Sequence, residues 1–195
     1  MASKETNYLE AVGWLHSAKN RQPVNGAGEP IPWYSYAAIH FLENRLPTDL
    51  DVWEFGSGLS TLWWATRCRS LRTVEHNRGW YEKMTSLAPD NVSLNHVELD
   101  IDGDYAASIA LPAQHYDIVV VDGRDRVHCA IHAIPWIKPR GIVVWDDSER
   151  ERYTPGFEAL KTNGFRRIDF IGLGPVTANR QATTIFYRDG NILGL

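Results

Sequence analysis

Between residues 51 and 147, short apolar runs alternate with segments of helical length or spacing. The five runs read DVWEF, LRTVEH, VSLNHVEL, YDIVVVD and GIVVWDD. Strands that alternate with helices predict a parallel sheet with helices on both faces. The nearly continuous apolar run at residues 116–121 is typical of a central strand that is buried on both sides.

The pattern changes after a helix predicted over residues 155–162. The runs GFRRIDFIGLGP and QATTIFYRD are joined by a turn-rich loop with no helix between them, which predicts a hairpin. One strand must then run antiparallel to the rest. We therefore expect an α/β fold of the Rossmann-like type: a three-layer sandwich around a mostly parallel seven-stranded sheet with an antiparallel C-terminal hairpin strand.

Residues 1–195 are predicted to form one domain, in which residues 1–47 make an N-terminal cap of helix and loop. The first helix is expected to begin at Ser3 as N-cap. Its apolar residues at helical spacing are Tyr8, Leu9, Val12 and Leu15. The Pro-, Gly- and Asn-rich stretch KNRQPVNGAGEPIPW is expected to be loop, and a second helix is predicted over residues 35–45.

Composition argues against several classes of partner. A formal net charge of −4 does not favour a nucleic acid backbone or an anionic membrane surface. No window approaches eighteen apolar residues, so no membrane span is expected. Cys68 and Cys129 have neither disulfide-framework nor metal-ligand spacing, and the start of the chain lacks the apolar stretch of a signal peptide. These features predict a reduced, cytoplasmic protein.

The stretch DVWEFGSGLST contains two glycines of a nucleotide-binding loop. Gly56 and Gly58 allow a tight turn and the close approach of a ligand. A dinucleotide loop would have a third glycine where Thr61 stands, and Glu54 adds negative charge nearby, so a pyrophosphate is disfavoured. The alternative is a strand-to-helix turn without a ligand. Glu75 follows Gly56 by about twenty residues, a spacing that suits hydrogen bonds to ribose hydroxyls.

The sequence resembles the S-adenosylmethionine-dependent methyltransferases of the class I, Rossmann-like type. The motifs that carry the resemblance are EFGSG at residues 54–58, VEH at 74–76, DIVVVD at 117–122, GIVVWDD at 141–147 and the terminal hairpin. The resemblance covers roughly residues 36–188. It implies S-adenosylmethionine as cofactor, with Gly56, Ser57 and Gly58 near the methionine part and Glu75 on the ribose.

The resemblance also implies that Asp100 or Asp102 lies near the adenine, with Trp80 or Tyr81 over the ring. Core packing at the start of a helix is the alternative for both aromatic residues. The complete set of expected cofactor-binding residues is Glu54, Gly56, Ser57, Gly58, Glu75, His76, Asp100, Asp102 and Asp122.

Asp122, Asp146 and Asp147 stand at the ends of two strands that are expected to be neighbours. Three converging carboxylates would repel one another, and a divalent cation such as Mg²⁺ would relieve the repulsion. This arrangement resembles the metal-dependent O-methyltransferases, in which the metal binds the acceptor hydroxyls and favours their deprotonated form. The resemblance therefore implies Asp122, Asp146 and Asp147 as metal ligands.

The catalytic base is less well defined, because no lysine follows Asp122 as it does in the catechol-type enzymes. The expected catalytic residues are Asp122, His128 as the nearest titratable side chain, and Arg124, which could orient an acidic acceptor. The alternative is that Asp125 and the neighbouring arginines form salt bridges in a loop. His128 and His132 have i,i+4 spacing, which suits either a metal or a helix surface.

The predicted function is methyl transfer from S-adenosylmethionine to a small-molecule acceptor, at oxygen, with Mg²⁺ assistance. Acceptor specificity is assigned to residues 30–36, 148–153 and 172–180, although the first segment could equally form a packing or homodimer surface. Nucleic acid and membrane are not expected as partners. Alternatives are an NAD-dependent oxidoreductase or epimerase, disfavoured by Thr61, the hairpin and the absence of a Tyr-x-x-x-Lys pair, and a non-catalytic nucleoside-binding module.

Overall fold

The computed structural model describes residues 7–195 and contains a seven-stranded sheet in the order β3-β2-β1-β4-β5-β7-β6. β1 to β5 run parallel, and β7 pairs antiparallel with both β5 and β6. The strands are β1 (Asp51–Phe55), β2 (Ser70–Glu75), β3 (Val92–His96), β4 (Tyr116–Val121), β5 (Ile137–Asp146), β6 (Arg166–Leu173) and β7 (Arg180–Tyr187). The predicted fold class, including the antiparallel hairpin strand, is confirmed.

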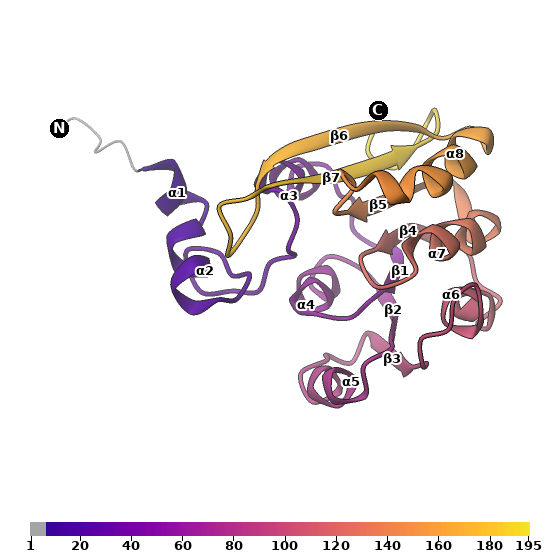
Figure 1. The fold of residues 1–195 in the computed structure, drawn as a ribbon, viewed down its shortest axis with the longest axis horizontal. Helices are drawn as coiled ribbons and strands as arrows, with labels where there is room; N and C mark the ends of the chain where they lie inside the picture. The colour runs from indigo at the N-terminus through magenta and orange to yellow at the C-terminus, as the bar shows by residue number, and fades with distance from the viewer. Residues whose placement is uncertain (1–6) are drawn as a thin grey trace.

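Helices cover both faces of the sheet. Figure 1 shows α3, α4 and α5 on one side and α6, α7 and α8 on the other. The helices are α1 (Tyr8–Ala11), α2 (Trp14–Asn20), α3 (Tyr36–Glu43), α4 (Leu59–Ala65), α5 (Arg78–Thr85), α6 (Asp104–Ala107), α7 (Arg126–Ala133) and α8 (Thr154–Thr162), with short 3₁₀ turns at Ser108–Ala110, Ile134–Trp136 and Glu151–Tyr153. None of the helices within residues 7–195 is long and apolar enough to cross a membrane.

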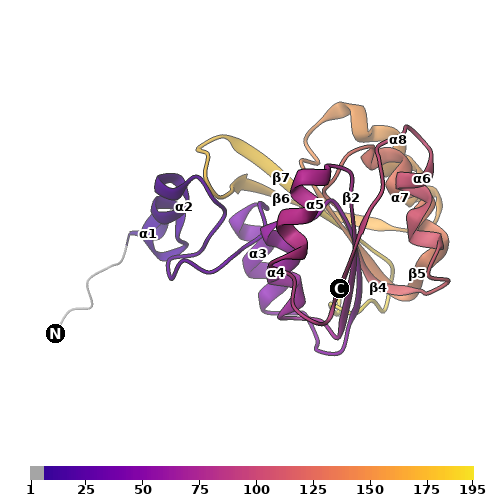
Figure 2. The same cartoon turned by 90° about the horizontal axis from the view of Figure 1, so that it is seen from below.

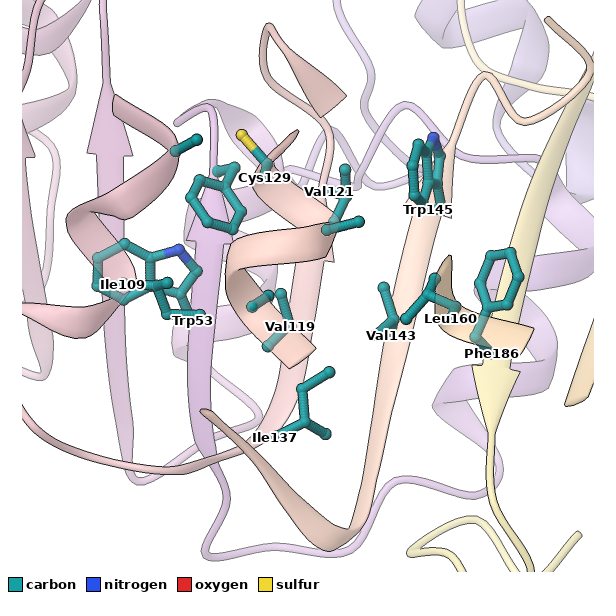
Figure 3. Packing of buried hydrophobic residues seen from close by; sticks show 14 of the residues in the cluster. Trp53, Ile109, Val119, Val121, Cys129, Ile137, Val143, Trp145, Leu160 and Phe186 are labelled. Carbon is teal, nitrogen blue, oxygen red and sulfur yellow. The ribbon is translucent and has the colours of Figure 1, made fainter. Parts of the chain in front are cut away.

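Strand β4 lies at the centre of the sheet, as its continuous apolar sequence predicts. Its side chains alternate between two cores: Val119 and Val121 pack with Trp53 and Trp145 under α6, α7 and α8 (Figure 3), whereas the neighbours Ile118 and Val120 face α3 and α4. Burying a side chain of this size stabilises the fold by about 1.5–3 kcal/mol. Packing on both faces of the sheet therefore fixes the positions of the carboxyl ends of β1 and β4.

The N-terminal region differs in detail from its prediction. Ser3 lies outside the described residues, and the expected first helix is two helices, α1 and α2, separated at Gly13. Gly13 has a φ of 83°, and a Cβ there would lie 2.4 Å from the backbone nitrogen of Gly26. The helix is therefore interrupted where the backbone of Gly13 packs against the backbone of Gly26. The second predicted helix is confirmed as α3, with Ser35 as its N-cap.

The helices α1 and α2 lie away from the sheet (Figures 1 and 2). The loop between β6 and β7 extends toward them, and Trp14 Nε1 of α2 donates a hydrogen bond of 3.1 Å to the Thr177 carbonyl in that loop. Further along, Gln181 Nε2 donates to the Trp33 carbonyl at 2.9 Å. The N-terminal segment is thus attached to the β6–β7 hairpin.

Candidate functional site

Two cavities meet at the carboxyl ends of the central strands, where open α/β sheets bind ligands. The larger is about 970 Å³ and lies over the loops after β1, β2 and β4, and the smaller is about 500 Å³ and lies beside the ends of β4, β5 and the start of β7. The residues that line both are Trp33, Asp122, Arg126, Asp147 and Arg150. The cavities therefore form one cleft with two compartments.

The glycine loop forms one wall of the larger compartment. Gly56 has a φ of 90°, and a Cβ there would lie 2.5 Å from the Cα of Gly123 in the loop after β4. Thr61, which replaces the third glycine of a dinucleotide loop, caps the following helix, because its Oγ1 accepts a hydrogen bond of 2.9 Å from the Gly58 amide. Thr61 thus stabilises the loop instead of making room for a pyrophosphate.

Glu54 supports this loop from below and is fully buried. Its carboxyl accepts hydrogen bonds from the hydroxyls of Ser60 at 2.6 Å and Thr61 at 2.5 Å. Burial raises the pKa of Glu54 to about 8, although these two hydrogen bonds oppose the rise. The residue was expected to bind cofactor, but it lines neither compartment, and its role in the structure is to position the loop.

Glu75 reaches the cleft from the end of β2 and holds the same loop. Its Oε2 accepts hydrogen bonds from the Ser57 amide at 3.0 Å and the Ser57 hydroxyl at 3.2 Å, and its Oε1 accepts one from the Asn77 amide at 2.8 Å. His76 Nδ1 lies 3.0 Å from Oε1. Ser57, Glu75 and His76 all line the larger compartment. Their role in binding a cofactor stays a prediction.

The two aspartates expected near an adenine lie elsewhere. Asp100 accepts hydrogen bonds from the amides of Asp104 at 2.9 Å and Tyr105 at 3.1 Å, and so begins α6. Asp102 pairs with His132 at 3.0 Å. Neither aspartate lines the cleft: the Asp100 carboxyl faces the first amides of α6, and Asp102 Oδ1 faces His132 of α7.

The two neighbouring aromatic residues of α5, Trp80 and Tyr81, lie in different surroundings. Trp80 lines the larger compartment, and its indole Nε1 donates a hydrogen bond of 2.6 Å to the Ser57 carbonyl. Tyr81 packs against His96, with 5.6 Å between ring centroids. Of these two residues, Trp80 is therefore the one that faces the larger compartment, and Tyr81 takes the packing role.

Asp122, Asp146 and Asp147 converge as predicted, but around an arginine. The Arg126 Nη2 lies 3.1 Å from both Asp122 Oδ1 and Asp147 Oδ2, and the same guanidinium donates to the Asp146 carbonyl. Arg150 lies 2.7 Å from Asp147, and the Asp146 carboxyl accepts a hydrogen bond from the Thr183 hydroxyl at 2.8 Å.

The three expected metal ligands therefore do not fit a divalent cation. Two guanidinium groups already neutralise Asp122 and Asp147, and within residues 7–195 no group of three or more His, Cys, Asp or Glu side chains is arranged to hold a metal. The predicted convergence is right. The predicted metal does not fit, because Arg126, four residues after Asp122, already pairs with Asp122 and Asp147.

Among the three expected catalytic residues, Asp122 has the central position, because it lines both compartments. Burial raises the pKa of Asp122 to about 6; Arg126 opposes this rise and Asp147 adds to it. Arg124 is exposed and lines the larger compartment. His128 pairs with Asp125 at 2.7 Å and lines neither compartment, so the alternative of a salt-bridged loop describes it better.

All three loops assigned to acceptor specificity contribute to the smaller compartment. They supply Trp33, then Glu149 and Arg150, then Thr177, Asn179 and Arg180. The sequence reasoning missed Arg21 and Lys83, which line the larger compartment from the N-terminal segment and from α5. No local pattern marks these two residues, because only the packing of distant segments brings them to the cleft.

The fold is shared with solved structures of methyltransferases and related proteins. Precorrin 8w decarboxylase from Methanobacterium thermoautotrophicum matches 86% of this chain and 97% of its own, at 19% identity and a TM-score of 0.60. An rRNA methylase from Streptococcus thermophilus matches 79% and 96%, at 10% identity and a TM-score of 0.58.

A Streptococcus mutans protein described as a methyltransferase and solved in complex with SAH matches 77% of this chain and 95% of its own, at 11% identity and a TM-score of 0.56. No protein-family model matches the sequence. No curated protein matches it either. These likenesses establish the class I methyltransferase fold.

Proposed function

We propose that this protein is an S-adenosylmethionine-dependent methyltransferase that acts on an oxygen of a small molecule. The observation that carries the proposal is the position of Asp122, a carboxyl with a raised pKa at the junction of two connected compartments. The larger compartment contains the glycine loop and Glu75, and the smaller one is lined by the three variable loops. Such a cleft suits a cofactor on one side and an acceptor on the other.

When bound, S-adenosylmethionine supplies an electrophilic methyl group, so the protein chiefly has to align and desolvate the acceptor. Glu75 and Trp80 are the residues that would hold the nucleoside part, and the loop with Ser57 would lie along the methionine part. Asp122 would accept the proton from the acceptor hydroxyl, because its pKa of about 6 leaves it ionised yet basic near neutral pH. Arg126 fixes the orientation of Asp122 through their 3.1 Å contact.

Assistance by Mg²⁺ is not part of this proposal, because the donor set around Asp122 is already paired with Arg126 and Arg150. An NAD-dependent reaction is disfavoured because Thr61 fills the place of the third glycine and caps α4. The cytoplasmic location and a homodimer stay predictions.

The proposal is tested by calorimetric titration with S-adenosylmethionine, S-adenosylhomocysteine and NAD, each with Mg²⁺ and with EDTA. We expect both methionine-derived ligands to bind under either condition, and NAD not to bind. Transfer of a labelled methyl group to a panel of hydroxylated acids and phosphates then measures activity. The Asp122→Asn variant should lose about 100-fold or more in kcat, because it lacks the base.

The matched control is Asp90→Asn, an exposed aspartate outside the cleft, which should keep wild-type activity. Affinity of Asp122→Asn for S-adenosylhomocysteine separates a lost base from a damaged cofactor site. Binding of NAD without the methionine-derived ligands would refute the proposed function. Turnover that EDTA abolishes and Mg²⁺ restores would instead show that a metal takes part.

A further inference from the structure

Strand β6 lies at one border of the sheet, so that only one side of its backbone has a strand partner (Figure 1). It pairs with β7 in a register that continues without a bulge from residue 166 to residue 173. Within residues 7–195, no backbone hydrogen bond from any other segment reaches β6. β6 has eight residues, whereas β3, at the opposite border, has five. β6 is therefore the longer of the two border strands.

The sequence of β6 lacks several features that keep an edge strand from pairing with another chain. Such edges are commonly blocked by proline, lysine or a β-bulge. The strand reads RRIDFIGL, with no proline and no lysine, and Ile171 leaves 53% of its surface exposed. Arg166 already pairs with Asp189, whereas Arg167 and Asp169 lie 3.5 Å apart and are both exposed. The open edge therefore carries one positive and one negative side chain, two residues apart.

These two charges make β6 complementary to itself in the antiparallel direction. If a two-fold axis passes at Ile168, Arg167 of each copy lies opposite Asp169 of the other. Opposite charges in such cross-strand pairs are stabilising, and like charges directly opposite are destabilising. An axis at residue 167 or 169 would instead place two copies of Arg167, or of Asp169, opposite each other. The charge pattern therefore favours the register about Ile168 over both neighbouring registers.

The segment that the sequence offers as a homodimer surface, residues 30–36, does not suit that role. Ile31, Pro32 and residues 34–36 are buried within the single chain, and the exposed Trp33 lines the cleft. A contact between two copies of this chain therefore requires another surface, and β6 is an edge with unpaired backbone groups.

We propose that two copies of this chain associate through antiparallel pairing of β6 about Ile168, with reciprocal ion pairs between Arg167 and Asp169. The pairing joins the two sheets and restrains the β6–β7 hairpin. The loop of that hairpin supplies Thr177 and Asn179 to the smaller compartment, so association steadies one wall of the cleft. This inference goes beyond the proposed function and does not depend on the reaction in the cleft.

The test is analytical ultracentrifugation of the full chain over a range of protein concentrations. Arg167→Asp leaves two acids on the edge and Asp169→Arg leaves two bases, so each variant repels its own copy. Each should associate about tenfold or more weakly than the wild type. An equimolar mixture of the two variants brings opposite charges together again and should form a mixed dimer of near wild-type affinity. Damage to the fold would not be repaired by mixing.

Arg78→Asp is the matched control, because this exposed arginine on α5 also pairs with an acid, Glu82, and the change in net charge is the same. It should leave association unchanged. Three results would each overturn the inference. These are a wild type that stays monomeric at every concentration, a dimer that both variants retain, and a mixture that associates no better than its components.

A second measurement does not depend on charge. Two copies of residue 168 on the axis would have Cα atoms about 4.5–5.5 Å apart, which is within the range of a disulfide. Mild oxidation of Ile168→Cys should therefore give a covalent dimer, whereas the wild type, which contains only Cys68 and Cys129, should give none under the same conditions. Absence of the covalent dimer in a folded Ile168→Cys variant would exclude this register.

Discussion

Glu54 is an acidic side chain at the end of β1 with no exposed surface. The sequence predicts a ligand-binding role from its place before the glycines, whereas the structure gives its oxygens to Ser60 and Thr61. An acidic residue before the glycines can thus stabilise the glycine loop through hydrogen bonds without facing a ligand. Burial favours the neutral form of a carboxyl, so this residue makes folding sensitive to pH.

The pKa of Glu54 is raised from 4.5 to about 8, so the native state retains a proton that the unfolded state has lost between these values. The contribution of Glu54 to stability is therefore full below pH 4.5 and is lost as pH rises through about 8. Its slope is at most about 1.4 kcal/mol per pH unit. Glu54→Gln, which cannot ionise, should lack this slope in urea unfolding measured at several pH values.

Glu158→Gln serves as the control, since Glu158 is exposed on α8 and should keep the wild-type slope. If Glu54→Gln and the wild type lose stability in parallel with rising pH, the pKa of Glu54 is not raised in the native protein.

At the scale of elements, the loop after β1 and the loop after β4 are in backbone contact at Gly56 and Gly123. The parallel pairing of Phe55 with Val121 brings these loops together, and the glycines allow them to touch. The sequence shows why glycine is needed for a turn. It does not show that the loop after β4, at Gly123, leaves no room for a side chain on Gly56.

Gly56→Ala should lower the free energy of unfolding by about 1–3 kcal/mol, because alanine would have to adopt a φ of 90° with its Cβ 2.5 Å from Gly123. Gly58→Ala is the matched control in the same loop. Its Cβ would meet Ser60 Oγ at 3.7 Å, an ordinary contact, and the expected change is below about 1 kcal/mol. Urea unfolding without ligand measures both, and equal losses would contradict the contact described here.

At the scale of the whole molecule, the cleft is closed on one side by the N-terminal segment. Arg21, Gln22 and Pro23 line the larger compartment together with Trp80 and Lys83 of α5. The segment is held by the contact of Trp14 with the loop between β6 and β7, as Figure 2 shows for the arrangement of these elements. The loop between β6 and β7 thus helps to position the segment that contains α2.

Trp14→Ala should free this segment, raise hydrogen exchange in residues 14–33 and weaken binding of S-adenosylhomocysteine by about three- to tenfold, because one side of the compartment loses its support. The fold of the sheet should be retained. Leu15→Ala, on the same helix with 48% of Leu15 exposed, should change neither measurement. Unchanged exchange in Trp14→Ala would show that other contacts hold the segment.

The sequence by itself determined the layers, the antiparallel hairpin and the edge of the sheet at which the cleft lies. These features follow from local periodicity and from the glycines, since residues close together in the chain decide which face of a strand or helix is apolar. Ser57 and Glu75 could be predicted for the same reason, because their place at strand ends is a local property.

The tertiary structure alone decided which groups neutralise one another. Arg126 lies between Asp122 and Asp147, and Asp100 caps α6, because these partners are nearest once the strands and helices have packed. The pairing of a charge depends on every element that surrounds it, and hence on distances that no local pattern contains. For that reason the sequence predicts a cluster of three acids, whereas the structure shows two of them, Asp122 and Asp147, already paired with arginine.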